Sequence, residues 1–512
     1  MELVLQVLGN LLSVDVLLVS LLGAIVGVVL GAIPGMNGGI GIAVMLPFTY
    51  AMGPAQGLLF LGGIYLGSSY GGSISGILIN CPGTAESACT TIEGHAMTER
   101  GEGKKALYYS IIASGFGSMV GLVVLVLFAP VLSNVAVKFG PPEMLLLSIC
   151  GLTIVGSLTG KNIAKGLFAA CFGLFLAMIG IDDVSGAVRF TFGIRALRGG
   201  IDLIPAVIGL FAITEMVRQG MSQLQSRSLD ARVELKPSRF GDVLKSTFTK
   251  YLKVLLKSSV IGTFIGILPG TGGAIASFLA YGEAKGKDKE GTFGKGNPAG
   301  IIAPESANNA AVGGSLVPML ALGIPGSATS AIMFGALTIH GLVPGQSLFT
   351  DHAEIVYTFL IGMFLVTIFM ILIGVLGIPV FSSIVKLKMR FIIPVVILFS
   401  LIGAYSVNNS MNDVVIAIGL GIVGVVFARL EIPNTPIVLG LILGGIIESN
   451  FVRTMTIVKA TGTNIFTYVL TRPICIAILL LTVYLIWANV RALQKGRKVQ
   501  MTTSVTQDLR DE

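Results

Sequence analysis

Charged side chains are scarce in this sequence of 512 residues. Asp, Glu, Lys and Arg make up 12% of the chain, whereas hydrophobic residues make up 54%, and the mean hydropathy is +0.89. This composition is not that of a soluble protein. Apolar tracts of about 18 residues or more recur along the chain, and tracts of that length predict transmembrane helices.

Histidines, cysteines and nucleotide-binding motifs are also few or missing. The three histidines are dispersed and the five cysteines form no CxxC pair, so neither a zinc site nor a disulfide framework is predicted. No GxxxxGK[ST] loop is present, which excludes ATP as a direct energy source for this chain. Without a catalytic constellation, we expect a protein that is not an enzyme and has no cofactor.

The net charge of +8 is concentrated in two segments. Residues 218–257 contain nine basic and three acidic side chains, and residues 491–512 contain five and three. A basic excess beside membrane helices marks the cytoplasmic side, so we interpret 218–257 as a cytoplasmic linker with an amphipathic part on the membrane surface. The tail 491–512 is expected to be cytoplasmic too. Nucleic-acid binding is not predicted, because these basic residues flank apolar helices and lack interleaved aromatic side chains.

Two helix-breaking motifs interrupt long apolar tracts. One is NCPGTA at residues 80–85, and the other is GIPGSA at residues 323–328. Proline removes a backbone donor and glycine adds conformational freedom. In lipid, the freed backbone groups survive only where protein or a polar cavity covers them. Paired breaks in corresponding places of two chain halves point to the binding site of a transporter.

The surrounding glycines and prolines indicate an internal duplication. The pattern GxxxGxxPGxxG begins at Gly27 and again at Gly262, an offset of 235 residues. Gly71 and the PGTA of residues 82–85 recur as Gly314 and the PGSA of residues 325–328, an offset of 243. Two ordered sets at nearly the same offset are hard to obtain by chance.

Lys and Arg residues predict that the two copies lie upside down relative to each other. The first copy has no basic residue near residues 53–54 and three in its exit loop, 98–105. The second copy has four in its connection, 283–298, and none in its exit, 340–354. The positive-inside rule then gives the copies opposite orientations.

The expected fold is therefore an all-α polytopic membrane protein with two inverted-topology repeats. Broken helices or re-entrant hairpins would meet at a central site, and about ten to twelve helices would cross the membrane. The expected division is a first repeat half, 1–217, the linker, 218–257, a second repeat half, 258–490, and the tail, 491–512. Within the first copy we expect a helix over 14–33, a short re-entrant tract over 40–52, and a third tract, 57–79. The polar, glycine-rich run 67–73 is expected to interrupt that third tract.

Polar or flexible groups inside apolar tracts are the candidate ligands. Amide donors and helix N-termini suit a carboxylate, whereas carbonyl and hydroxyl oxygens suit Na⁺. The candidate substrate-binding residues are Asn37, Gly38, Ser68, Ser69, Asn80, Pro82, Gly83 and Thr84 in the first half, and Thr271, Gly272, Asn308, Asn309, Pro325, Gly326, Ser327 and Thr329 in the second. Na⁺ would be coordinated by backbone and side chains near Pro34, Gly35, Thr84, Pro269, Gly270 and Ser327. The plainer interpretation is that these serines and glycines only pack helices.

Two carboxylates also lie close to these motifs. Glu86 follows the first loop and Glu305 precedes Asn308. An intramembrane carboxylate is by default a functional hypothesis, here a proton or cation site, although both residues could instead sit at an interface. Glu93 and His95 end the first unit and are expected to cap it or face water.

The motifs resemble those of the large membrane subunit of tripartite tricarboxylate transporters, the TctA family. The resemblance rests on GAIPG at 31–35, GIYLGSSYGG at 63–72, INCPGT at 79–84, PESANNA at 304–310 and LGIPG at 322–326. It implies a secondary transporter of the bacterial inner membrane that takes up carboxylates such as citrate with a cation gradient, Na⁺ or H⁺. It also implies two partners, a small membrane subunit and a periplasmic solute-binding protein. The alternatives are a passive anion channel and a membrane scaffold subunit.

Overall fold

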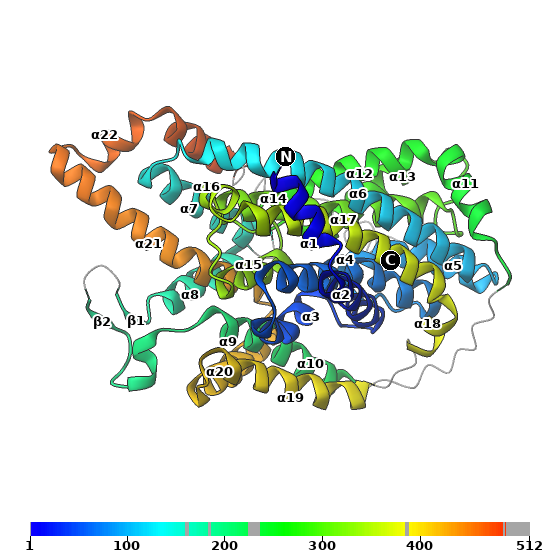
Figure 1. Ribbon diagram of the computed structural model, residues 1–512, viewed down its shortest axis with the longest axis horizontal. Helices are drawn as coiled ribbons and strands as arrows, with labels where there is room; N and C mark the ends of the chain where they lie inside the picture. Colours follow the sequence, from blue (N-terminus) through cyan, green and yellow to red (C-terminus); the bar gives the residue numbers. More distant parts are fainter. Residues whose placement is uncertain are drawn as a thin grey trace, which may run out of the picture. The chain divides into compact units, whose positions relative to one another are not determined.

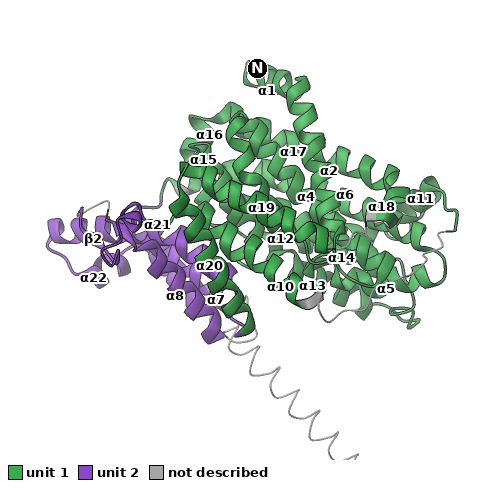
Figure 2. Ribbon diagram, turned by 90° about the horizontal axis from the view of Figure 1, so that it is seen from below, with its two compact units in different colours: residues 1–138, 201–429 green, residues 139–200, 430–512 purple. Residues whose placement is uncertain are grey.

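The computed structural model describes residues 2–158, 163–182, 186–223, 236–384, 389–484 and 487. This part of the chain is almost wholly helical, and its strands are the short antiparallel pair β1 (Gly180–Ile181) and β2 (Val188–Arg189) (Figure 1). The all-α class expected from the sequence is confirmed. The chain forms two compact units, residues 1–138 with 201–429, and residues 139–200 with 430–512 (Figure 2).

Seven helical segments in the described residues are long and apolar enough to cross a membrane. They are Val14–Ala32, Gly103–Val135, Leu203–Met221, Ala353–Leu376, Arg390–Asn408, Met411–Arg429 and Thr435–Thr461. Four shorter apolar helical segments accompany them, among them Gly38–Ala51 and Ala328–Ile339. Seven is fewer than the ten to twelve expected, partly because the long helices of the protein interior contain much Gly, Ser and Asn. The chain is a multi-pass membrane protein.

The first unit contains both copies of the duplicated motif. Its elements before residue 139 are α1 (Glu2–Leu11), α2 (Val14–Ala32), α3 (Gly38–Met45), η1 (Leu46–Ala51), α4 (Pro54–Ile79), η2 (Ala85–Ser87), α5 (Ala88–Glu99) and α6 (Gly103–Ala136). Its later elements are α9 (Leu203–Val207), η4 (Ile208–Ile213), α10 (Thr214–Gln223), α11 (Phe240–Lys250), α12 (Leu252–Ile267), α13 (Gly272–Gly286), α14 (Ala299–Leu322), α15 (Ala328–Ile339), α16 (Gln346–Thr350), α17 (Ala353–Leu376), α18 (Ile378–Ile384), α19 (Met389–Asn408) and α20 (Met411–Arg429).

Two long buried helices, α4 and α14, form the centre of this unit. Nearly every residue of each is buried, and each packs on a glycine-bearing partner, α4 on α2 and α14 on α12. A Cβ at Gly27 of α2 would lie 2.7 Å from the carbonyl oxygen of Gly63, and one at Gly262 of α12 would lie 2.1 Å from that of Ala307. Real Cβ atoms do not come so close, so glycine is what allows these backbones to touch.

The expected interruption at residues 67–73 is wrong, because α4 continues through it as a helix. The glycines of this run serve packing instead. A Cβ at Gly67 would lie 2.8 Å from the carbonyl oxygen of Ala24, and one at Gly71 would lie 2.5 Å from that of Val28. The serines remain compatible with the helix because their hydroxyls donate to carbonyls one turn back, as Ser68 and Ser69 both do to Tyr65.

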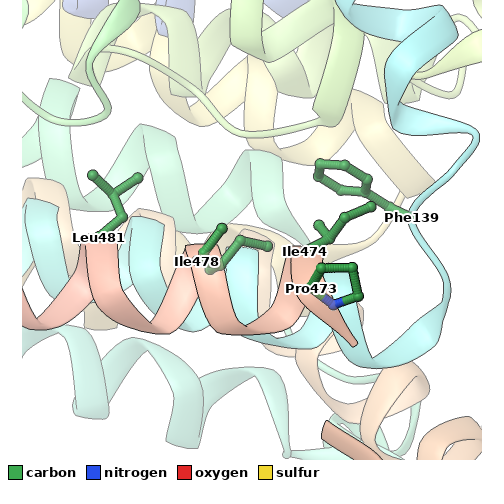
Figure 3. A pocket seen from close by; sticks show the side chains of 6 residues that line it. Phe139, Pro473, Ile474, Ile478 and Leu481 are labelled. Atoms are coloured by element: carbon green, nitrogen blue, oxygen red, sulfur yellow. The ribbon is translucent and has the colours of Figure 1, made fainter. Parts of the chain in front are cut away.

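The second unit is smaller. It contains α7 (Pro141–Leu158), α8 (Ile163–Ala177), η3 (Arg195–Gly199), α21 (Thr435–Thr461), α22 (Ile465–Leu470) and the helix Pro473–Tyr484. Buried or half-buried ion pairs join its parts, Arg472 with Glu143 at 2.9 Å and Arg189 with Glu448. Figure 3 shows Ile474, Ile478 and Leu481 along one face of the last helix, where they line a pocket with Phe139, Pro473 and Ala477. This lining is wholly apolar and does not suit a carboxylate.

The predicted basic linker and tail lie partly outside the described residues. Residues 224–235 and the tail 491–512 belong to the undescribed part. Of the rest of the linker, Arg218 lies in α10, and α11 packs on α6 through edge-to-face ring contacts, Tyr108 with Phe240 and Phe116 with Phe248. The apolar face of α11 is thus covered at least partly by protein.

Candidate functional site

The first loop pair joins the end of α2 to the end of α4. The N–H of Gly35 donates to the carbonyl oxygen of Gly83 at 3.2 Å, and the N–H of Gly83 donates to that of Gly72 at 2.9 Å. A Cβ at Gly83 would lie 2.2 Å from the carbonyl oxygen of Gly31. Backbone N–H groups at the two Pro-Gly breaks therefore find carbonyl acceptors inside the protein, one in the other break and one in α4.

The second loop pair repeats this arrangement. The N–H of Gly270 donates to the carbonyl oxygen of Gly326 at 3.0 Å, and the N–H of Gly326 donates to that of Ser315 at 3.3 Å. A Cβ at Gly326 would lie 2.4 Å from the carbonyl oxygen of Gly266. Every one of these positions matches its first-copy counterpart at the offset of 235 or 243, so the duplication read from the sequence extends to individual hydrogen bonds.

The helix ends around the loops are duplicated as well. Asn80 and Gly323 end α4 and α14 in the left-handed conformation, with φ of 55° and 72°. Ser327 begins α15 with a capping box to Ser330, and Thr84 has the same relation to Ser87. These positions again differ by 243 residues, and they fix where each chain segment turns back.

Hydrogen bonds also connect the two copies. The Tyr65 hydroxyl of α4 lies 2.7 Å from the Ser327 hydroxyl and 3.0 Å from that of Ser315. In the other direction, the Asn308 amide of α14 donates to the carbonyl oxygen of Ser69 at 3.0 Å. Tyr65 was not among the candidates expected from the sequence. The offset of 243 could have found it, because it places Tyr65 opposite Asn308.

The helix N-termini meet the loop of the opposite copy. A Cβ at Gly38, the first residue of α3, would lie 2.3 Å from the Ser68 hydroxyl and 3.5 Å from the methyl group of Thr329. A Cβ at Gly273, in the first turn of α13, would lie 2.3 Å from the Asn308 amide oxygen and 3.0 Å from the Cγ of Glu86. The two loops and the two short helices thus interlock.

Burial divides the predicted residues into two groups. Ser68, Thr84, Asn308 and Ser327 are at most 7% exposed. The more accessible members are Pro34, Gly35, Asn37, Ser69, Asn80, Pro82, Pro269, Gly270, Gly272 and Thr329, all half-buried or exposed. Asn37 caps α3 by accepting from the N–H of Ile40 at 3.0 Å, whereas Thr271 donates to the carbonyl oxygen of Leu268 at 2.9 Å. Both roles are local, and Pro325 is buried in the second loop.

Asn309 does not join this cluster. Its amide donates to the Ser118 hydroxyl of α6 at 3.1 Å and its side chain is fully buried. Neighbouring residues of a helix point about 100° apart, so Asn308 faces α4 while Asn309 faces α6.

One further residue reaches the Pro-Gly break that follows α2, at residues 34–35. Gln219 of α10 packs on Gly35, because a Cβ there would overlap the Gln219 amide at 1.8 Å. The same amide donates to Glu215 at 2.8 Å, and Glu215 also pairs with Arg218. No sequence pattern links α10 to this loop, which is separated from it by more than 180 positions.

Glu93 is not at a water-facing end, contrary to expectation. It is fully buried and accepts N–H groups of the 283–298 connection, from Gly296 at 2.8 Å and Asn297 at 2.9 Å. The Arg100 guanidinium donates to the carbonyl oxygen of Gly296 at 3.0 Å. The exit of the first copy and the connection of the second copy are therefore bound to each other.

The loop Lys287–Pro298 also carries an acid with a shifted pKa. Asp288 accepts backbone N–H groups, from Phe293 at 2.9 Å and from Thr292 and Glu290. These hydrogen bonds, that of Phe293 first, lower the pKa of the Asp288 carboxyl below its usual 3.8.

Together, the exposed apolar helices and the interlocked, duplicated loops define a polytopic membrane protein. The chain belongs to the tripartite tricarboxylate transporter TctA family, whose sequence profile matches residues 17–439. This confirms the resemblance carried by the motifs, and it makes the chain a membrane subunit of a tripartite tricarboxylate transporter. A transporter family also fits the expectation that the chain is not an enzyme.

Two relatives in Agrobacterium vitis are similar to this chain. An uncharacterised 52.8 kDa protein of the TAR-I ttuC' 3' region is 34% identical over 444 residues, which cover 86% of this chain and 88% of the relative. An uncharacterised protein of the TAR-II ttuC' 3' region is 33% identical over 203 residues, which cover 40% of this chain and 84% of the relative. No solved structure matches the chain.

Proposed function

We propose that this chain is the permease of a binding-protein-dependent secondary transporter that takes up small di- or tricarboxylates across the bacterial inner membrane. A gradient of Na⁺ or H⁺ would drive it, the periplasmic binding protein would deliver the substrate, and the small membrane subunit would complete the complex. The C-terminus would be cytoplasmic. Family membership supports the transporter class, whereas substrate, ion and partner dependence belong to the proposal.

The observation that carries the proposal is the duplicated pair of loops with hydrogen bonds between the copies. Helix N-termini carry partial positive charge and unpaired N–H groups, which suit an anion. The N-termini of α3, α13 and α15 all lie at these loops, beside hydroxyl groups of Ser327 and Thr329. A carboxylate bound here would meet dipoles and hydroxyls. The nearby Glu86 carboxylate would repel it, so a cation that screens Glu86 would favour substrate binding.

Two sets of contacts support the inverted orientation of the copies. Arg100 and Glu93 bind the connection 283–298, so the exit of copy one and the connection of copy two share a side. At the other end, a Cβ at Gly57 would lie 2.5 Å from the His340 ring. The connection of copy one therefore lies beside the exit of copy two. Copies of the same orientation would place connection with connection.

Uptake into vesicles tests the proposed function. This chain, its small subunit and its binding protein would be reconstituted, and labelled citrate and a panel of dicarboxylates supplied under a Na⁺ gradient, a proton gradient or neither. Accumulation that needs one gradient and the binding protein is the expected result. Equilibration without accumulation would show a passive anion channel, and no flux from an assembled complex would show a scaffold subunit.

A further inference from the structure

A buried carboxylate lies outside the loop site, in a cage of hydroxyl groups. Glu305 of α14 is fully buried. The Thr90 hydroxyl donates to one of its oxygens at 2.6 Å. The hydroxyls of Ser114 and Ser110 donate to the other at 2.9 Å and 3.2 Å. The Ser73 hydroxyl lies 2.7 Å from that of Ser110. Helices α5 and α6 thus supply hydroxyls to a single carboxylate of α14, and α4 adds the Ser73 hydroxyl behind that of Ser110.

No positive charge balances this carboxylate among the described residues. None of their ion pairs includes Glu305. Tyr70 of α4 and Cys89 of α5 interact with it, and neither side chain is positive in any protonation state. Hydroxyl donors reduce the cost of burying an ionised carboxylate but supply no net charge. One positive unit at Glu305 would make the cage neutral.

The cage continues as a line of oxygens between α6 and α14. Asn309 lies four residues after Glu305, and its fully buried amide oxygen has no hydrogen-bond partner. Ser110, Ser114 and Ser118 follow one another at the four-residue spacing that places them on one face of α6. The Tyr70 hydroxyl is a second buried oxygen without a partner. Orphan buried oxygens are costly. One of these belongs to a residue four positions from Glu305, and the other belongs to a tyrosine that interacts with Glu305.

Packing alone does not account for these groups. The α6–α14 interface is already formed by backbone contact at glycines, since a Cβ at Gly117 would lie 2.2 Å from the carbonyl oxygen of Ser306 and one at Gly121 would lie 2.4 Å from that of Ala310. Small residues suffice for such an interface. A carboxylate in its middle adds desolvation cost without improving the packing.

The cage is built on the elements that hold the first loop. Ser73 follows Gly72, whose carbonyl oxygen receives the N–H of Gly83. Thr90 lies in the first turn of α5, directly after the loop, and Asn308 lies three residues beyond Glu305. A charge change at Glu305 would therefore act on both sides of the loop site.

We propose that Glu305 holds the positive charge, a proton or a Na⁺ ion, whose entry is coupled to movement of the loop at residues 80–87. The groups that hydrogen-bond to Glu305 are hydroxyl oxygens, which suit both of these cations. In the empty cage the hydroxyls donate to the carboxylate. With a proton bound, Glu305 donates in turn, and with Na⁺ bound, the hydroxyl oxygens face the ion. This inference rests on the proposed function, because coupling has meaning only for a gradient-driven transporter.

The test compares net accumulation with exchange in the same vesicles. The probe is the labelled carboxylate that the wild-type complex accumulates, with Na⁺ replaced stepwise by choline in one arm and external pH varied in the other. For Glu305→Gln, which keeps the shape of the side chain and removes its charge, we expect accumulation to fall about tenfold or more. A loss of cation affinity equivalent to one pKa unit is already a factor of ten. Exchange of labelled for unlabelled substrate, which needs no net ion movement, should stay within about threefold. Glu99→Gln, at an exposed carboxylate of α5, is the matched control.

The arms separate the ions and the failures. If Glu305→Gln loses the dependence of accumulation on Na⁺ concentration at fixed pH, the ion is Na⁺. If it loses only the dependence of accumulation on external pH, the ion is the proton. If Glu305→Gln accumulates substrate like the wild type, the inference is wrong. If the wild type itself never accumulates substrate, the proposed function is wrong. That outcome needs no variant. Should Glu305→Gln not assemble, Ser114→Ala is expected to shift the half-saturating cation concentration by about threefold or more, and an unchanged value would overturn the inference.

Discussion

The two copies of the loop motif share their backbone and differ in their side chains. Gly35 with Gly83 and Gly270 with Gly326 make the same hydrogen bonds at 3.2 Å and 3.0 Å. By contrast, at the offset of 243 residues Tyr65 of the first copy corresponds to Asn308 of the second, and Glu86 corresponds to Thr329. Duplication therefore preserved the geometry of the breaks, whereas the groups that point between the copies diverged.

The difference has a consequence for charge. The first loop carries the acid Glu86, and the hydroxyl cage is completed by Glu305 of the second copy, whose first-copy counterpart is Gly62. A symmetric pair of loops would present the same charge from both sides. This chain has Glu86 where the second copy has Thr329, and Glu305 where the first copy has Gly62.

The largest expected contrast concerns orientation. In a background without native cysteines, we would place single cysteines at Lys104, in the exit of copy one, and at Asp351, in the exit of copy two. An impermeant thiol reagent should label Asp351→Cys from the periplasmic side and Lys104→Cys only after the membrane is opened, because inverted copies put these exits on opposite sides. Labelling of both cysteines from one side would contradict the inverted arrangement of the two copies.

A single added Cβ in each copy can disturb the backbone contact that the two loops share. Gly83→Ala and Gly326→Ala place a Cβ at 2.2 Å and 2.4 Å from a carbonyl oxygen. Overpacking against backbone costs about 1–3 kcal/mol or more, so we expect uptake to fall by about tenfold or more in both variants. Gly282→Ala, where nothing lies within 4 Å, is the control. A large loss in only one copy would show that the two loops are not equivalent in function.

Part of this arrangement was predictable from the sequence. The helix expected over 14–33 is Val14–Ala32, because an N-cap, an apolar run and a Pro-Gly break are local signals. The repeated offsets located both loops because the same glycines and prolines recur in each half of the chain. The continuous helix through residues 67–73 was not predictable, since its glycines are explained by the backbone of α2 and not by their own neighbours.

The contacts across the chain could not be predicted. The sequence left open whether Glu305 is an intramembrane carboxylate or lies at an interface. Its partners Thr90 and Ser114 lie on helices whose pairing no local pattern reveals. Glu93 reads as a polar end of a helix and is in fact buried by a loop about 200 residues later. Such roles depend on which helices pack together, and composition does not determine that.

The bonds between the copies sharpen the comparison at smaller cost. Tyr65→Phe removes one hydroxyl shared by Ser327 and Ser315, and Asn308→Ala removes the donor to the carbonyl oxygen of Ser69. Each lost hydrogen bond is worth about 0.5–1.5 kcal/mol, so we expect initial uptake rates to fall about threefold to tenfold in each variant. Tyr405→Phe, at an exposed side chain of α19, is the control. A loss for Asn308→Ala without one for Tyr65→Phe would mean that uptake depends on the bond from Asn308 to Ser69 and not on those of Tyr65.

The smallest expected effect lies in the connection of the second copy, residues 283–298. Asp288 holds the loop Lys287–Pro298 through backbone N–H groups that lower its carboxyl pKa below the usual 3.8. A folded-state pKa below the unfolded value stabilises the loop above the unfolded pKa, and this contribution is lost as the pH falls through the folded pKa. Hydrogen exchange at the amides of residues 290–293, corrected for intrinsic rates, should therefore be slow at about pH 5–7, where an ordinary Asp, with a pKa of about 3.9, is ionised. The exchange should quicken as the pH falls through the lowered pKa of the Asp288 carboxyl.

Two variants and one transport assay complete this prediction. Asp288→Asn should flatten the pH dependence of exchange and Glu290→Gln should not, because Glu290 contributes only its backbone N–H. Since Glu93 holds the neighbouring amides of Gly296 and Asn297 independently, transport by Asp288→Asn should change by less than about twofold, the size expected for one exposed contact. A large transport defect in this variant would mean that the loop moves with the transport cycle and does not only mark the side on which the two copies meet.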